Sequence, residues 1–97
     1  MKNLHLSSKD LKILRSIFNG NFDTIIFGSR VSGTNQQFSD IDICLKGEKL
    51  LDKALISDLR ALCSESDLPY TVDLVDYHDL SPDFREIVDQ TGIHLAR

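Results

Sequence analysis

An alternating segment at residues 40–45 constrains the fold of this chain more than any other feature. Asp40 and Asp42 alternate there with Ile41 and Ile43. Side chains at positions i and i+2 of a β-strand point to the same face. A strand over residues 40–45 would therefore bury the two isoleucines against a core and project the two aspartates together from the opposite face.

Two adjacent carboxylates suggest that a cation binds between them. They repel each other and resist joint ionisation unless a positive charge lies nearby. Mg²⁺ takes oxygen ligands from one or two carboxylates and completes its shell with substrate phosphates. Asp40 and Asp42 therefore predict a metal–phosphate site, although an edge strand with one solvated face commonly carries acidic residues too.

The segment before this strand has the features of a phosphate-binding turn. Residues 24–27 are apolar on both faces, which is typical of an interior strand. Gly28 then permits a close backbone approach or a positive φ, and Ser29 offers a hydroxyl and an amide to an oxyanion. Arg30 could face a triphosphate, or it could equally pair with an acidic neighbour or a partner protein. An isolated Gly-Ser is more often an ordinary turn; the carboxylate pair downstream favours the phosphate site.

The N-terminal part of the chain predicts a helix over residues 8–19. Ser7 is suited to be its N-cap, with Asp10 reaching back in a capping box. Four apolar residues then recur at helical spacing: Leu11, Leu14, Ile17 and Phe18. We expect this stripe to face the core.

A second helix is predicted over residues 49–64, and its buried stripe is expected to consist of leucines. These are Leu51, Leu55, Leu59 and Leu62. Because the helix lies between the strand at 40–45 and another predicted at 70–77, it forms a crossover that makes these two strands parallel neighbours.

The strand at 70–77 supplies a third carboxylate. Asp73 lies on the face opposite Val72 and Leu74, so beside the first strand it would join the aspartate pair. Asp76 falls on the other face, where we expect a solvent-exposed residue at the strand end. A different register would exchange the roles of the two aspartates.

The C-terminal part predicts a third helix over residues 82–90, with Ser81 as N-cap, Pro82 at the first position and a stop near Gly92. Residues 93–95 either add a strand or dock. Together the elements predict an α/β fold of the α+β type, a small mixed sheet of three to five strands flanked by three helices, in one domain spanning residues 1–97.

Composition narrows the function classes. With 97 residues, 41% of them hydrophobic, the chain can build one core, and no apolar run reaches the length of a membrane span. A net charge of −4 argues against broad nucleic-acid binding. Cys44 and Cys63 have no metal-ligand spacing and fit a reducing cytoplasm; Cys44 is expected to be a packed residue without a nucleophilic role. The three histidines, His5, His78 and His94, are expected at the surface or at strand ends.

The ordered set of motifs resembles a known family. Gly28-Ser29, ten further residues, Asp40-Ile41-Asp42 and a later Val72-Asp73-Leu74 are similar to the DNA polymerase beta-like nucleotidyltransferases. Among these, the chain resembles the small stand-alone minimal nucleotidyltransferase (MNT) proteins. The resemblance covers residues 24–77.

This resemblance implies an activity: Mg²⁺-dependent transfer of a nucleoside monophosphate, foremost AMP from ATP, to a hydroxyl. The nucleotide phosphates would lie on Gly28 and Ser29, with Arg30 as a further nucleotide-binding candidate. Asp40, Asp42 and Asp73 would be the catalytic and metal-binding residues. Two magnesium ions are expected, and Asp73 would ready the attacking hydroxyl as base or ligand.

The resemblance also implies a partner. MNT proteins are paired with small helical HEPN proteins in toxin–antitoxin systems, so we expect a cytoplasmic antitoxin that transfers AMP to a HEPN toxin. Its contact surface is expected around Ile93 and Leu95. Two alternatives remain open: the nucleotide-binding subunit of a two-component transferase acting on a small molecule, and a non-catalytic binding antitoxin. Homo-oligomerisation is compatible with each of them.

Overall fold

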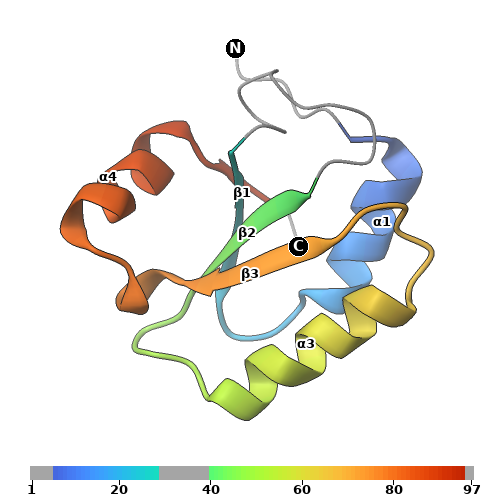
Figure 1. Ribbon diagram of the computed structural model, residues 1–97, viewed down its shortest axis with the longest axis horizontal. Coiled ribbons are helices and arrows are strands. Elements are labelled where there is room, and N and C mark those ends of the chain that lie inside the picture. The colour runs from blue at the N-terminus through green and yellow to red at the C-terminus, as the bar shows by residue number, and fades with distance from the viewer. Residues whose placement is uncertain (1–5, 29–39, 96–97) are drawn as a thin grey trace.

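The computed structural model describes residues 6–28 and 40–95 (Figure 1). In chain order its elements are α1 (Ser8–Ile17), β1 (Asp23–Phe27), β2 (Ile41–Lys46), α3 (Lys53–Glu65), β3 (Val72–Asp76), the short 3₁₀ helix η1 (Tyr77–Asp79), α4 (Pro82–Thr91) and β4 (Ile93–His94). The 3₁₀ helix was not predicted. No helix in the described ranges is long and apolar enough to cross a membrane.

The strands form one mixed sheet in the order β3-β2-β1-β4. Strand β2 runs antiparallel to β1 and parallel to β3, while β4 adds to the other side of β1 in antiparallel orientation. The predicted parallel crossover and the interior position of residues 24–27 are therefore confirmed. So is the fold class, with four strands and, in the described part of the chain, three α-helices.

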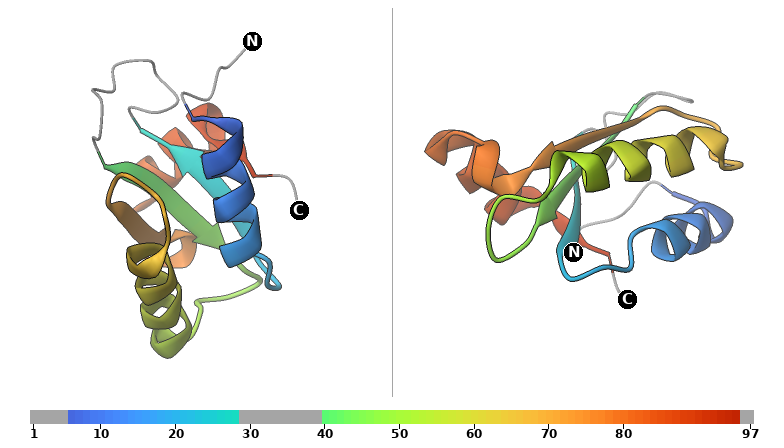
Figure 2. Two further views of the ribbon diagram at one scale, coloured as in Figure 1. Left: turned by 90° about the vertical axis from the view of Figure 1, so that its right-hand side faces the viewer. Right: turned by 90° about the horizontal axis from the view of Figure 1, so that it is seen from below.

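One face of the sheet is covered by α1 and α3, which lie in front of it in the left view of Figure 2. Ile41, Ile43 and Leu45 of β2 point into this layer and are fully buried. They pack against residues contributed by both helices and by the neighbouring strands: Leu14, Phe18, Ile26, Leu59, Cys63 and Leu74. Burying this apolar surface is the main driving force that holds the two helices on the sheet.

The opposite face is covered by α4. Its Val88 is buried against Ile25, Phe27 and Cys44, which alternate along the strands with the residues of the first core. The period of two along β1 and β2 thus supplies both layers. Asp42 shares this face with Cys44, and its partner Asp73 on β3 lies on the same face.

Helix α1 begins as predicted, but its capping box is incomplete. The Ser7 hydroxyl accepts a hydrogen bond from the Asp10 amide at 3.1 Å. The Asp10 carboxylate was expected to return this contact, and that prediction is wrong: it accepts a hydrogen bond from the Tyr70 hydroxyl at 2.7 Å. The side chain therefore ties α1 to the segment before β3.

Helix α3 starts later than predicted and buries a different face. Asp52 is its N-cap and accepts a hydrogen bond from the Ala54 amide at 2.9 Å, so Leu51 lies outside the helix. Leu55 and Leu62 are 37% and 48% exposed, which contradicts the predicted leucine stripe. The inward face is made instead by Ile56, Leu59 and Cys63.

The C-terminal elements agree with the sequence. The Ser81 hydroxyl accepts a hydrogen bond from the Phe84 amide at 3.3 Å, Pro82 opens α4, and Gly92 ends it. Residues 93–94 do form a strand. Leu95 is only 8% exposed and packs into the first core, so the prediction that Leu95 belongs to a partner-binding patch is wrong.

Candidate active site

The sheet places Asp42 and Asp73 side by side. They are register partners on the parallel strands β2 and β3, and Asp42 is also the partner of Phe27 on β1. Partnered side chains in a sheet share a face. Phe27, Asp42 and Asp73 therefore form a row across the sheet, on the face that α4 covers further along.

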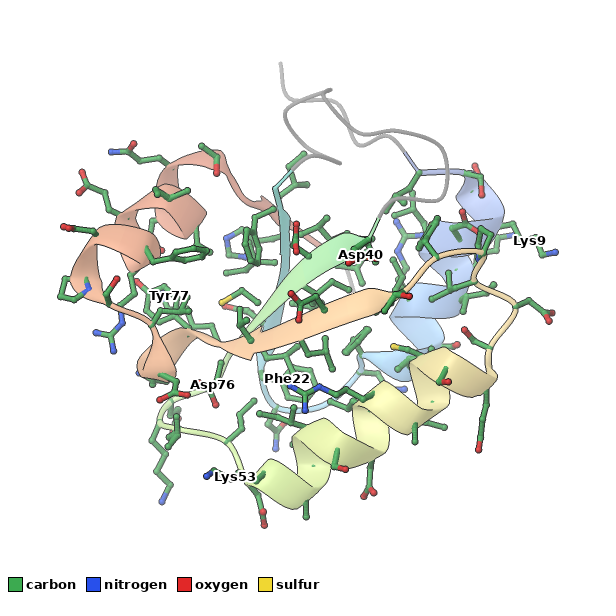
Figure 3. The ribbon with its side chains drawn as sticks, viewed as in Figure 1. Lys9, Phe22, Asp40, Lys53, Asp76 and Tyr77 are labelled. Carbon is green, nitrogen blue, oxygen red and sulfur yellow. The ribbon has the colours of Figure 1, made fainter. Side chains whose placement is uncertain are left out.

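Asp40 completes the acidic group. It directly precedes β2, at the beginning of the arrow in Figure 3. Asp40 and Asp73 are exposed and Asp42 is half-buried. The predicted pairing of Asp73 with the strand that carries Asp42 is confirmed, and the register excludes an exchange between Asp73 and Asp76.

Gly28 brings the backbone against this group. Its φ is +81°, in the left-handed region that L side chains rarely adopt. A Cβ at this position would overlap the Oδ2 atom of Asp42. Both reasons proposed for a glycine here, a positive φ and a close approach, are therefore confirmed.

The electrostatics of Asp42 favour a bound cation. Its pKa is raised above the ordinary value, first by loss of solvation and then by the negative charges of Asp73 and Asp40. A divalent cation would relieve the repulsion among these charges, and hard oxygen donors are the ligands that Mg²⁺ prefers. In residues 6–28 and 40–95, no three acidic, histidine or cysteine side chains converge on one point as metal ligands. Mg²⁺ needs only one or two carboxylates, because phosphates and water fill its remaining positions, so the donor set fits.

Two predicted nucleotide-binding residues, Ser29 and Arg30, lie outside the described residues. Gly28 and Asp40, the described residues on either side of the gap, both lie at the acidic group.

Asp76 differs from the prediction. It was expected in solvent, but its side chain is only 6% exposed. Its carboxylate accepts hydrogen bonds from the Leu51 amide at 2.7 Å and from the His78 amide at 3.0 Å. Asp76 therefore joins β3 to the segment before α3. Alternation predicted its face correctly, but it carried no information about the loop that covers it.

Cys44 is confirmed as a packed residue. It is fully buried, and loss of solvation raises the pKa of its thiol to about 12. A thiol that keeps its proton at neutral pH is a poor nucleophile. Of the histidines, His94 is exposed, half-buried His78 has Nε2 2.8 Å from the Gly47 carbonyl oxygen, and His5 lies outside the described residues.

A cluster around Tyr77 was not predicted from the sequence. Its hydroxyl donates to Asp89 at 2.8 Å, and the Lys46 ammonium lies 4.4 Å from the ring centroid. Arg85 donates to the Tyr77 carbonyl at 2.9 Å. These contacts hold α4 to the ends of β2 and β3, and only the path of the chain after β3 brings these residues together.

Comparison with known proteins adds family information to this geometry. Residues 10–97 match the family described as "Polymerase beta, Nucleotidyltransferase". The chain is 39% identical over 88 residues to the "Probable protein adenylyltransferase MntA" of Haemophilus influenzae, covering 88% of this chain and 77% of that protein.

Solved structures are similar to this chain as well. A crystal structure of a toxin–antitoxin with AMP-PNP aligns with a TM-score of 0.70 and 31% identity, covering 91% of this chain and 70% of the other. A solved structure of a tri-AMPylated Shewanella oneidensis HEPN toxin in complex with MNT antitoxin contains a chain that aligns with a TM-score of 0.59 and 29% identity. The alignment covers 91% of this chain and 66% of the matched chain. The matched segment contains the three aspartates and Gly28. The chain belongs to the polymerase beta-like nucleotidyltransferase family.

Proposed function

We propose that this chain transfers AMP from ATP to a hydroxyl of a HEPN-type partner toxin and acts as its antitoxin. The observation that carries the proposal is the register pairing of Asp42 with Asp73 beside Gly28. The same chain is 39% identical to a probable protein adenylyltransferase. Carboxylates on adjacent strands next to a glycine turn provide what phosphoryl-group chemistry needs most, which is positioning and charge neutralisation.

Each residue has a distinct role in the proposed reaction. Asp40 and Asp42 hold Mg²⁺, which when bound neutralises charge on the triphosphate and helps to activate the attacking oxygen. The turn at Gly28 and Ser29 binds phosphate oxygens. Asp73, exposed at the edge of the group, accepts the proton of the acceptor hydroxyl. The acceptor oxygen then bonds to the α-phosphorus, the bond to the β-phosphate oxygen breaks, and pyrophosphate leaves.

The accessibility of the carboxylates supports a macromolecular acceptor. Asp40 and Asp73 are exposed, so another protein can reach them without rearrangement of the described elements. Contact with that protein would exclude water and bring its hydroxyl to the attack distance of roughly 3–3.5 Å from the α-phosphorus.

A labelling experiment tests the proposal. The protein is incubated with Mg²⁺, α-labelled ATP and the protein encoded by the neighbouring gene, and that second protein is analysed by mass spectrometry for added AMP. We expect the adduct with the wild type and a loss of transfer of about 10²-fold or more with Asp42→Asn. Asp42→Asn should stay folded, because removing one of three crowded carboxylates relieves repulsion.

Calorimetric titration with ATP, with and without Mg²⁺, separates binding from transfer. The metal should strengthen ATP binding to the wild type but not to Asp42→Asn. Labelling of a small alcohol in place of the toxin would indicate a two-component transferase. Tight toxin binding without any labelling would indicate a non-catalytic antitoxin.

A further inference from the structure

Helix α4 exposes two large apolar side chains. Phe84 is 39% exposed and Ile87 is 52% exposed. They are three residues apart, so they lie on neighbouring positions of one helix flank. We call these two residues the α4 patch. The other large hydrophobic residues exposed in the described part of the chain are Leu50, Leu55 and Leu62, in or just before α3.

The α4 patch adjoins the acidic site. The Phe84 ring meets the Phe27 ring edge to face, with centroids 5.8 Å apart, and Phe27 is the register partner of Asp42. Helix α4 packs through Val88 on the face of the sheet from which Asp42 and Asp73 project. The leucines of α3 belong to the helix on the opposite face. A protein bound at the α4 patch would therefore lie on the side where transfer takes place.

The surroundings of the patch are acidic. Asp83 and Glu86 are exposed on α4 beside Ile87, and we call these two residues the acidic rim. Asp89 lies on the other flank of the helix, where it accepts a hydrogen bond from the Tyr77 hydroxyl. The only basic residue of this helix, Arg85, is half-buried, and it donates hydrogen bonds to the carbonyls of Tyr77 and His78 at 2.9 and 2.8 Å. The outer surface of α4 therefore combines an apolar patch with neighbouring carboxylates. Arg85 does not neutralise their negative charge, because its side chain is turned toward the backbone of Tyr77 and His78.

We propose that the α4 patch and its acidic rim form the docking surface for the acceptor protein, whose contact surface carries an apolar pocket within a basic rim. This inference rests on the proposed function, because it assumes that the acceptor is a protein. Apolar anchors at the centre with charge complementarity around them are the usual anatomy of a specific interface. Docking on α4 places the acceptor beside Phe27, one strand away from Asp42 and two from Asp73.

The two helices provide a matched pair of variants. Ile87→Lys and Leu62→Lys each replace a half-exposed aliphatic residue by the same cation, on opposite faces of the sheet. Affinity for the protein encoded by the neighbouring gene, taken as the candidate toxin, is measured by calorimetry, together with thermal unfolding of each variant. We expect Ile87→Lys to lose at least about tenfold in affinity, and Leu62→Lys to remain within about twofold of the wild type. Both should unfold at nearly the temperature of the wild type.

The acidic rim has its own test. The double variant Asp83→Lys, Glu86→Lys should slow association with the toxin and weaken its dependence on salt, because rim charges act mainly on the association rate. Mg²⁺-dependent ATP binding should be the same in all of these variants, since none of the exchanged side chains belongs to the acidic site.

The outcomes separate the docking inference from the function. If the wild type transfers AMP and Ile87→Lys binds the toxin as tightly as the wild type does, the docking inference is wrong and the function stands. Loss of binding in Leu62→Lys alone would move the interface to α3 and also overturn the inference. Binding that depends on Ile87 without AMP transfer would support the docking surface and overturn the catalytic function. Absence of toxin binding by the wild type would overturn both.

Discussion

Asp73 and Asp76 lie three residues apart in β3 and differ in their exposure to solvent. Asp73 is exposed beside Asp42, whereas Asp76 is buried and accepts two backbone hydrogen bonds. One strand therefore carries a carboxylate that is free for chemistry and another that is committed to structure.

The two aspartates predict a clean separation of activity from stability. Asp73→Asn should lower AMP transfer by about 10²-fold or more, because an amide cannot accept the proton of the acceptor hydroxyl. Its free energy of unfolding should change by no more than about 0.5 kcal/mol. Asp76→Asn should instead lower the free energy of unfolding by about 1–3 kcal/mol, since the amide NH₂ opposes one of the two backbone donors.

Transfer assays and denaturant unfolding of both variants check this pair. The reverse ranking, with transfer lost only in Asp76→Asn, would contradict the role given to Asp73.

Gly28 predicts a second residue-scale effect. Gly28→Ala should weaken Mg²⁺-dependent ATP binding, because the new methyl group displaces the Asp42 carboxylate. Alanine would be strained at the positive φ of this position, so the substitution should also reduce the free energy of unfolding by about 1–3 kcal/mol. Gly47→Ala is the control: its Cβ would meet the flexible Leu51 side chain, with Cδ2 at 2.9 Å, at the opposite end of β2. Calorimetry should show unchanged ATP binding for Gly47→Ala; an equal loss in both variants would argue against a specific contact at Gly28.

At the scale of elements, α3 shows that tertiary packing determines which face of a helix is buried. The chain offers two overlapping apolar stripes, one of leucines and one formed by Ile56, Leu59 and Cys63. The second faces the sheet, where Leu59 and Cys63 are buried in the first core and Ile56 packs against it. The choice leaves Leu55 and Leu62 at the surface.

This orientation predicts unequal effects of two similar substitutions. Leu59→Ala should lower the free energy of unfolding by about 2–5 kcal/mol, because it opens a cavity in the first core. Leu62→Ala should change it by no more than about 0.5 kcal/mol, since that side chain is 48% exposed. Urea unfolding of the two variants is the measurement, and equal losses would mean that the leucine stripe is the buried one.

At the scale of the whole molecule, the buried thiols couple stability to alkaline pH. Burial raises the pKa of Cys44 from 9.0 to about 12 and that of Cys63 from 9.0 to about 11. The folded state keeps these protons while the unfolded chain releases them above pH 9, so the free energy of unfolding falls as the pH rises from 9 toward the folded-state values. A single such group contributes a slope of up to about 1.4 kcal/mol per pH unit.

Cys44→Ala should therefore be less sensitive to alkali than the wild type. Its free energy of unfolding is expected to be lower at pH 8, because a packed side chain is truncated, but to fall less steeply above pH 9. Denaturant unfolding along a pH series checks the difference in slope. Parallel curves for the two proteins would show that the Cys44 thiol does not cause the effect.

Much of the fold and of the candidate site followed from the sequence alone. The alternation from Asp40 to Ile43, the apolar strand before Gly28 and the caps at Ser7 and Ser81 are local signals, and the structure confirms the elements that they predicted. Parity along β3 and the crossover helix were sufficient to pair Asp73 with the strand of Asp42, because a period of two and a parallel connection leave few arrangements.

Tertiary structure decided what depends on contacts between distant segments. In the folded chain, Asp76 is buried and accepts a hydrogen bond from the Leu51 amide, the Asp10 carboxylate accepts one from the Tyr70 hydroxyl, and Leu95 packs in the core. Tertiary structure also selected the buried face of α3 and left the α4 patch exposed next to Phe27. Periodicity identifies the face on which a side chain lies, but the partner that covers the face is set by how separate elements pack, and packing is a property of the assembled chain.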